Sequence, residues 1–222
     1  MDGRYVIRKD QVKTRVLMLN KPIDYVCTNH DPQQRQTVYS LLPKLHHDRW
    51  IGIGRLDINS SGLLLFTNNG ELANRFMHPK YELEREYAVR VLGAVNEDTL
   101  KTLQSGVELD DGEAKFVTII DAGGQGANHW YHVTLKEGRN REVRRLWEAV
   151  GHKVSRLHRI RYGSVQLPRS IKPGRYQELE SGTTDLLLEF VGLAKQEEQE
   201  RSSGKANRQG RGKQYKPRKK RR

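Results

Sequence analysis

The segment from Gly52 to Leu72, GIGRLDINSSGLLLFTNNGEL, places two charged residues shortly before the most apolar run of the chain. Within it, Leu63–Phe66 shows no alternation of apolar and polar positions, which is typical of a strand buried on both faces. A carboxylate is rarely buried unless it is paired. The position of Asp57 beside this run therefore needs a reason.

Arg55 and Asp57 point the same way if Trp50–Asp57 stays extended, because side chains alternate along a strand. One interpretation is a structural ion pair. The other is a carboxylate held in an apolar cleft, where electrostatic interactions are stronger. The spacing alone leaves both interpretations open.

Other patterns predict short strands and a few short helices. Strands are expected at Val16–Leu19, Leu83–Val91, Lys115–Ile120, Trp130–Leu135, Val154–Tyr162 and Arg175–Leu179. Helices are expected at Glu71–Met77 with Asn69 as its cap, at Glu97–Gln104 and at Arg141–Val150, whereas Thr184–Leu193 fits a helix or a strand. Because strands outnumber helices and short turns join most of them, we expect an α+β fold with a largely antiparallel or mixed sheet.

The segment Glu137–Gly151, EGRNREVRRLWEAVG, gathers arginines at the start of its predicted helix. Cations are slightly unfavourable at a helix N-terminus, so this arrangement also needs a reason. Contact with phosphate is one explanation, and pairing with a carboxylate such as Asp57 is another.

The charge of the chain is unevenly distributed. The sequence has 40 Lys+Arg and 27 Asp+Glu, a net of +13, and residues 195–222 hold 12 of the basic and 3 of the acidic residues. The other 28 basic and 24 acidic residues give positions 1–194 a net of +4. This asymmetry favours a polyanionic partner, most often nucleic acid, although a solubilising tail has the same composition.

Several functional classes are disfavoured. The single cysteine, Cys27, excludes a disulfide framework and a cysteine-based zinc site, and the histidines at 46, 47, 129 and 132 lack partners at ligand spacing. No apolar stretch approaches the roughly 20 residues of a membrane span, and the first residues lack the apolar core of a signal peptide. We therefore expect a soluble, cytoplasmic protein.

Four sequence blocks, in order, resemble motifs of the RsuA-type family of pseudouridine synthases. They are LNKPIDYVCT at Leu19–Thr28, GRLDINSSGLLLFTNNGEL at Gly54–Leu72, EREYAVRV at Glu84–Val91 and EGRNREVRRLWEAVG at Glu137–Gly151. The similarity spans roughly Arg15 to Leu193. The stretches ELANRFMHP and RRLWEAVG add a finer similarity to the RluB-type subgroup, which acts on 23S ribosomal RNA.

The resemblance implies a long mixed, mainly antiparallel sheet in two halves around a central catalytic cleft. It implies an RNA uridine isomerase, in which the N1–C1′ glycosidic bond breaks, the uracil rotates, and C5 rejoins C1′. Nothing is oxidised or transferred, so neither a cofactor nor a metal is expected. The expected partner is 23S ribosomal RNA or an assembly intermediate, and we expect a monomer without membrane contact.

The resemblance also assigns roles by position. Asp57 is expected to be the catalytic carboxylate, acting as nucleophile or base. Tyr87, which alternation places on the apolar face of its strand, is expected to stack on the target base, and Arg144 to pair with Asp57 and keep it ionised. The residues expected to contact RNA are Arg55, Lys21, Arg139, Asn140, Arg141 and Arg145.

One departure from the family pattern concerns the N-terminus. Family members usually begin with an S4-type RNA-binding module, whereas Met1–Val6 resembles only its closing strand, so we expect residues 1–13 to be a remnant of a module that is either naturally absent or cut away. We expect the catalytic domain at 14–194 and a basic, disordered tail at 195–222.

Two other hypotheses compete with this one. The first is a non-catalytic ribosome-assembly or RNA-binding protein on the same fold, against which the intact motif residues argue. The second is a glycoside hydrolase, which needs a second carboxylate about 5–10 Å from the first. Glu71 and Glu84 are the candidates, but neither lies in a comparable motif.

Overall fold

The computed structural model describes residues 13–46, 48–93, 95–125 and 127–193. The predictions for residues 1–12 and for the basic tail at 195–222 lie outside the described residues. None of the helices in the described ranges combines the length and apolarity that a membrane crossing requires.

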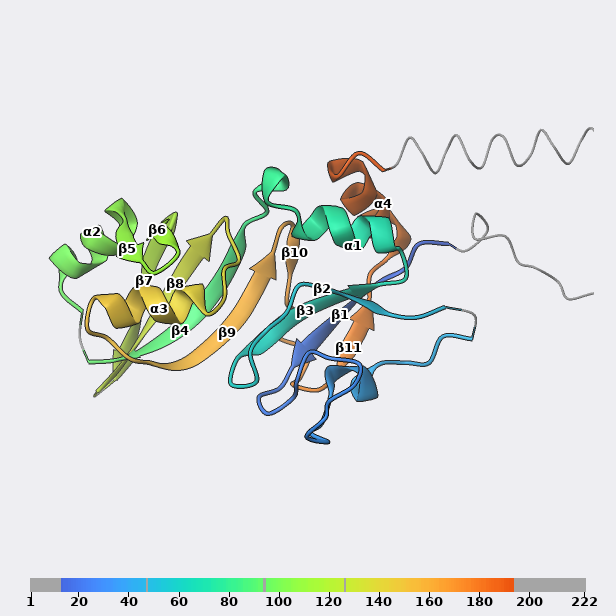
Figure 1. The fold of residues 1–222 in the computed structure, drawn as a ribbon, viewed down its shortest axis with the longest axis horizontal. Coiled ribbons are helices and arrows are strands. Elements are labelled where there is room, and N and C mark those ends of the chain that lie inside the picture. Colours follow the sequence, from blue (N-terminus) through green and yellow to red (C-terminus); the bar gives the residue numbers. More distant parts are fainter. Residues whose placement is uncertain (1–12, 47, 94, 126, 194–222) are drawn as a thin grey trace, which may run out of the picture.

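The elements follow the chain in an order that mixes strands and helices (Figure 1). The strands are β1 Val16–Lys21, β2 Ile51–Ile53, β3 Ser61–Thr67, β4 Arg85–Leu92, β5 Val107–Leu109, β6 Gly112–Ala114, β7 Thr118–Gln125, β8 Asn128–Leu135, β9 Val154–Tyr162, β10 Val165–Gln166 and β11 Tyr176–Glu178. The helices are α1 Gly70–Met77, α2 Glu97–Ser105, α3 Glu142–Ala149 and α4 Ser181–Phe190, with 3-10 turns at Val38–Leu41 and Pro79–Tyr81.

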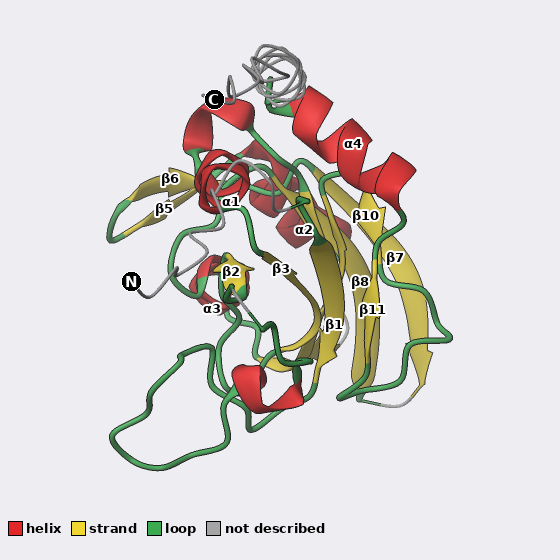
Figure 2. Cartoon of the chain, turned by 90° about the vertical axis from the view of Figure 1, so that its right-hand side faces the viewer, coloured by secondary structure: helices red, strands yellow, loops and turns green. Residues whose placement is uncertain are grey.

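One twisted sheet organises the described residues, with β7 at its outer edge (Figure 2). Its strand order is β11–β1–β3–β9–β4–β8–β7, with β10 paired to β9 and β2 paired to β3, while β5 and β6 form a separate hairpin. All pairs in the large sheet are antiparallel except β3 with β9. The predicted α+β fold with a mixed, mainly antiparallel sheet is therefore confirmed.

The parallel contact between β3 and β9 divides the sheet into two halves, and we call it the seam. It pairs Ser61 with His158 and Gly62 with Arg159. Gly62 has φ +100°, and a Cβ at this position would lie 2.2 Å from the backbone oxygen of Arg159. Only glycine therefore allows the two halves to approach this closely.

In the first half, formed by β11, β1, β3 and β2, the strands β1 and β3 are buried on both faces, whereas the edge strand β11 is exposed. Leu63 and Leu65 of β3 pack under α1 and α4, whereas Leu64 and Phe66 pack against the opposite layer, which residues 22–50 supply. The sequence prediction for Leu63–Phe66 is confirmed.

The second half, formed by β9, β4, β8 and β7, has α2 and α3 packed on one face. Tyr87, Val89 and Val91 of β4 face these helices and join a core with Leu103 and Trp147. Tyr87 thus lies on the buried face, as the alternation predicts. The intervening β4 residues are more exposed.

Local structure departs from the sequence predictions in two places and decides between the alternatives left open in a third. The strand expected over Trp50–Asp57 ends at Ile53, because Gly54 adopts φ +75° and turns the chain. The segment expected at Thr184–Leu193 as helix or strand lies largely in α4. The hairpin of β5 and β6 was not expected. Asn69 does cap α1, since its side chain accepts hydrogen bonds from the N–H groups of Glu71 and Leu72.

Candidate functional site

Asp57 lies in the loop of residues 54–60 that joins β2 to β3, directly before the seam. Leu56 anchors this loop because its side chain packs in the apolar core of the second half, the same core that contains Tyr87. The Cys27 thiol, 3.2 Å from the Leu56 carbonyl oxygen, donates to it. The backbone on the N-terminal side of Asp57 is therefore fixed by packing.

Lys21 holds the same loop from the first half of the sheet. Its side chain is fully buried, and its ammonium donates to the carbonyl oxygens of Asp57 at 3.1 Å and Ser60 at 2.8 Å, with further contacts to those of Pro22 and Ile58. Burial lowers the pKa of this ammonium. Backbone carbonyls therefore occupy the ammonium that was expected to contact phosphate, and the structure gives Lys21 a positioning role, while its contact with RNA stays a prediction.

Arg144 holds the loop from the second half. It is buried on α3 and donates to the carbonyl oxygens of Asn59 at 3.0 Å and Val154 at 3.1 Å. The expected ion pair with Asp57 does not form within 4.0 Å among the described residues. Burial and the charge of Arg141 lower the pKa of Arg144, while the negative charge of Asp57 acts in the opposite direction. Arg144 therefore positions the loop, and Asp57 favours its charged form from beyond ion-pair distance.

The Asp57 carboxylate itself is left without a hydrogen bond or an ion pair to any described residue. Its side chain is partly exposed, whereas Leu56 and Ser60 on either side are buried. The ring of Tyr87 is 8% exposed, and its hydroxyl also makes no hydrogen bond within the described ranges. The arrangement therefore combines a rigid backbone with a free carboxylate and a free phenol.

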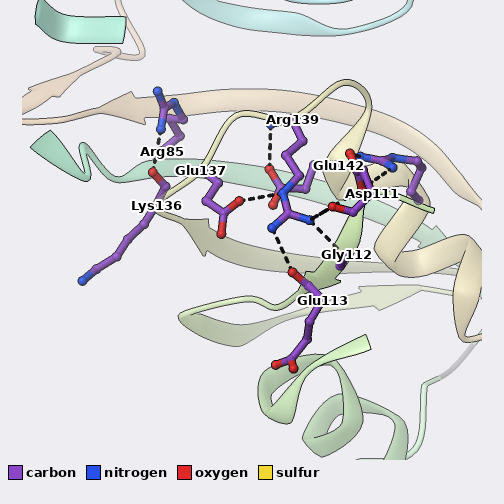
Figure 3. A network of polar contacts seen from close by, with 9 residues as sticks. Arg85, Asp111, Gly112, Glu113, Lys136, Glu137, Arg139 and Glu142 are labelled. Carbon is purple, nitrogen blue, oxygen red and sulfur yellow. Dashed lines mark hydrogen bonds and ion pairs between the residues drawn. The ribbon is translucent and has the colours of Figure 1, made fainter. Parts of the chain in front are cut away.

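Two of the predicted RNA-contact arginines are structural. The Arg139 guanidinium donates to the carbonyl oxygens of Gly112 at 3.0 Å and Glu113 at 2.9 Å and to the Glu137 carboxylate at 2.7 Å (Figure 3). Arg145 binds both carboxylate oxygens of Asp111, at 2.8 and 2.9 Å. These contacts fasten the β5–β6 hairpin to the start of α3 and leave few donors for a phosphate. The phosphate contacts expected for Arg139 and Arg145 stay predictions, and the contacts that the structure shows are structural.

The other predicted RNA contacts are exposed. Arg55 and Asn140 make no hydrogen bond or ion pair to the residues that the structure describes, and Arg141 has only a long contact of 3.8 Å to Glu148. Arg141 adopts φ +50° just before α3, which is uncommon for a residue with a side chain. These three side chains remain available for a ligand.

Arg159 at the seam was not identified from the sequence. It is 2% exposed, and its Nε donates to the Leu63 carbonyl oxygen at 2.7 Å across the boundary between the halves. Its position two residues after the buried Leu157, in a strand pattern that predicts burial, is the signal that could have revealed it.

Metal-ligand geometry is absent from the described part of the chain, where no group of three or more His, Cys, Asp or Glu side chains converges. His129 contacts Asp121 at 2.6 Å, and His132 contacts Glu86 at 3.5 Å. The two carboxylates considered for glycoside hydrolysis are engaged elsewhere, since Glu71 pairs with Arg75 and Glu84 with Arg161.

The sequence of residues 15–149 matches the RNA pseudouridylate synthase family. The chain is 54% identical over 195 residues to ribosomal large subunit pseudouridine synthase B of Escherichia coli K12, covering 87% of this chain and 67% of that protein. The protein of the same name from Yersinia pestis is also 54% identical, and that from Pseudomonas aeruginosa likewise. The chain spans 61% and 51% of these last two relatives.

Solved structures give the same likeness. A pseudouridylate synthase crystal structure superposes with a TM-score of 0.69 at 29% identity, covering 79% of this chain and 74% of that one. A chain of a Cbf5–Nop10–Gar1 complex superposes with a TM-score of 0.52 at 19% identity over 72% of this chain and 52% of that one, which shows a shared fold alone.

Proposed function

Because this chain belongs to the RNA pseudouridylate synthase family, we propose that it isomerises a uridine of large-subunit, 23S ribosomal RNA to pseudouridine. The names of its relatives, ribosomal large subunit pseudouridine synthase B, support this substrate. Action on ribosomal RNA also supports a cytoplasmic location, and we assign the chain as a monomer in that role.

One observation carries the proposal. Lys21 binds the Asp57 carbonyl from one half of the sheet, and Arg144 binds the Asn59 carbonyl from the other, yet the Asp57 carboxylate has no partner in the described residues. A structural aspartate uses its carboxylate to hold the fold. Here the fold holds the aspartate, which is the arrangement that a reacting group requires.

The proposed reaction needs one carboxylate and no net transfer. Asp57 acts as nucleophile or base when the N1–C1′ bond of the bound uridine breaks. The uracil then rotates, C5 bonds to C1′, the C5 proton leaves, and N1 gains a proton, so that the atoms of substrate and product balance. We assign stacking on the rotated base to the ring of Tyr87 and proton transfer to its hydroxyl, which has no hydrogen-bond partner among the described residues.

The remaining predicted residues divide into two roles. Arg55, Asn140 and Arg141 are the exposed groups that we assign to the RNA backbone, because phosphate contacts position a nucleic acid without reading its sequence. The target nucleotide is held out of its stack, as enzymes that act on a base within RNA require. Arg144 and Lys21 act as positioning residues through the loop backbone.

The direct test is pseudouridine mapping by carbodiimide adducts and primer extension. Purified full chain incubated with in vitro transcribed 23S rRNA should give a stop at one uridine, and rRNA from cells without the gene should lack that stop. Binding of rRNA with no conversion, in naked RNA and in ribosomal precursors alike, would instead favour the non-catalytic assembly protein. Release of free uracil would favour glycoside hydrolysis.

A further inference from the structure

A second candidate surface lies on the far side of the same sheet from α2 and α3. In β4, Tyr87, Val89 and Val91 face these helices, so Ala88 and Arg90 face the opposite way. The strand register extends this second surface across the neighbouring strands. We call it the open face, and its residues are Ala88, Arg90, Trp130, His132, Arg156 and His158.

The open face places two arginines directly opposite one another. Arg90 of β4 pairs in register with Arg156 of β9, and neither has a carboxylate within ion-pair distance among the described residues. Like charges at opposed cross-strand positions destabilise a sheet. An anion that lies between or above them would offset this cost.

Trp130 adds a stacking surface beside these charges. It is the cross-strand neighbour of Arg90 on β8, and the Arg90 guanidinium carbon lies 5.9 Å from the centre of its ring. Arg90 is also oriented by Ser155, whose hydroxyl accepts from Nε at 2.9 Å and donates to the Arg90 carbonyl. The terminal nitrogens of Arg90 remain free to donate to a ligand.

The surface is hollowed at this point. A shallow hollow of about 500 Å³ is lined by Arg90, Ala122, Gly123, Gly124, Asn128 and Trp130. Gly124 is required here, because a Cβ would lie 2.3 Å from the Asn128 carbonyl oxygen. Small residues on one side and an indole on the other leave room for a flat ring.

We propose that the open face is a second RNA-binding surface, which holds a single-stranded segment outside the one that carries the target uridine. A base stacks on Trp130, and the adjoining phosphates bind Arg90 and Arg156. Proteins that bind single-stranded RNA combine such aromatic platforms with a basic track. The inference rests on the proposed function only in taking RNA as the substrate, and it requires no catalysis.

Binding measurements on the full chain test this surface. The probes are fluorescein-labelled 12-nucleotide oligouridylate and transcribed 23S rRNA, read by anisotropy and by filter binding. Arg90→Gln/Arg156→Gln should lower the slope of log K against log salt by about 1.4, because each single-strand phosphate contact contributes about 0.7. Trp130→Leu should weaken oligouridylate binding at least about fivefold, and Trp130→Phe should restore most of that loss because it keeps a ring.

The matched control is Lys80→Gln/Lys115→Gln, which removes the same charge from two exposed positions off the open face. This control should change the affinity little. An equal loss in both double variants would overturn the proposal, since bulk charge alone would explain it. Unchanged RNA binding together with self-association that the open-face variant abolishes would also overturn it, in favour of a second copy of the chain.

Cross-linking of the unmodified chain avoids any effect of substitution on folding. Oligouridylate that contains 4-thiouridine should cross-link to peptides of β4 and β8, including Trp130, and Asp57→Asn should leave this pattern intact. Cross-links confined to the Asp57 loop and α3 would refute the second surface. A chain that cross-links through Trp130 but never forms pseudouridine would refute the proposed activity and leave this inference standing.

Discussion

Replacing Lys21 by methionine tests whether this residue supports the Asp57 loop or contacts RNA. Methionine keeps the length of the buried stem and removes the ammonium. The variant loses hydrogen bonds of 2.8 Å to Ser60, 3.0 Å to Pro22 and 3.1 Å to Asp57, together with a long contact of 3.5 Å to Ile58. The structure therefore predicts a loss of stability that a phosphate-contacting lysine would not show.

The size of the loss follows from the number and setting of these bonds. Hydrogen bonds from a charged donor contribute about 1.5–3 kcal/mol each. A buried carbonyl oxygen that is left without its donor costs about 1–3 kcal/mol. Part of this cost is offset because the variant no longer buries a charged ammonium and because water can reach the loop carbonyls. We expect about 2–4 kcal/mol, or a decrease in Tm of about 5–15 °C for a chain of this size.

Urea denaturation and thermal melting measure the effect, with Lys115→Met as the exposed control that should unfold like the parent. Turnover should fall together with stability, because a 1 Å shift of Asp57 can cost about a hundredfold in rate. Two results together would refute this reasoning and place Lys21 on a phosphate. They are unchanged stability and a slope of log K for RNA binding against log salt concentration that is smaller by about 0.7–0.9.

Three further predictions concern other parts of the structure. Gly62→Ala should destabilise the chain by about 2–4 kcal/mol in urea denaturation, because its positive φ and the Arg159 backbone exclude a Cβ, whereas the matched Gly182→Ala on α4 meets no atom and should not. Hydrogen bonding from Arg145 lowers the pKa of Asp111 in the folded state. The stability that the Asp111 carboxylate contributes is therefore present above its unfolded-state pKa of 3.8, and it is lost as the pH falls through its lower folded-state pKa. The stability difference between parent and Asp111→Asn should accordingly be present at pH 7 and vanish in acid melts. Tyr87→Phe should keep the melting temperature and the RNA affinity but lower single-turnover rates about 10²–10⁴-fold, as expected for a lost proton-transfer group, and an unchanged rate would limit Tyr87 to stacking.

The fold could be predicted because its signals are local. The alternation around Tyr87, the unbroken run Leu63–Phe66 and the Asn69 cap each specify their own element, and all three are confirmed. The β5–β6 hairpin was missed because each strand has three residues. Its turn signal, Asp110–Asp111 followed by Gly112, is nevertheless visible in the sequence. In the structure this glycine has φ +103°.

The roles of the cationic residues could not be predicted in the same way. A sequence shows which side chains carry charge, but every residue carries a carbonyl oxygen, so the acceptors of a buried cation leave no sequence signal. Lys21 binds Ser60 across 39 positions, and Arg139 binds Glu113 across 26. These partners depend on the sheet bringing distant loops together. The backbone contacts of Lys21 and Arg139 were therefore not predictable from the sequence, and their expected contacts with phosphate stay untested.

The same limit applies to the strand expected over Trp50–Asp57. Its alternation predicted that Arg55 and Asp57 share a face, but the turn at Gly54 ends the strand earlier. Tertiary anchors, with Leu56 in the core and Lys21 and Arg144 on the backbone, fix the direction of Asp57 instead.

We infer that Asp57 is a carboxylate whose backbone is held in place, whose side chain is unpaired among the described residues, and which reacts with the substrate. Pseudouridine formation on transcribed 23S rRNA by Asp57→Asn and by the parent chain, with thermal melting of both, tests it most directly. Because the carboxylate has no partner among the described residues, the variant should melt like the parent, bind the RNA, and form no pseudouridine. Retained conversion, or a variant that unfolds because the carboxylate was structural, would contradict the account.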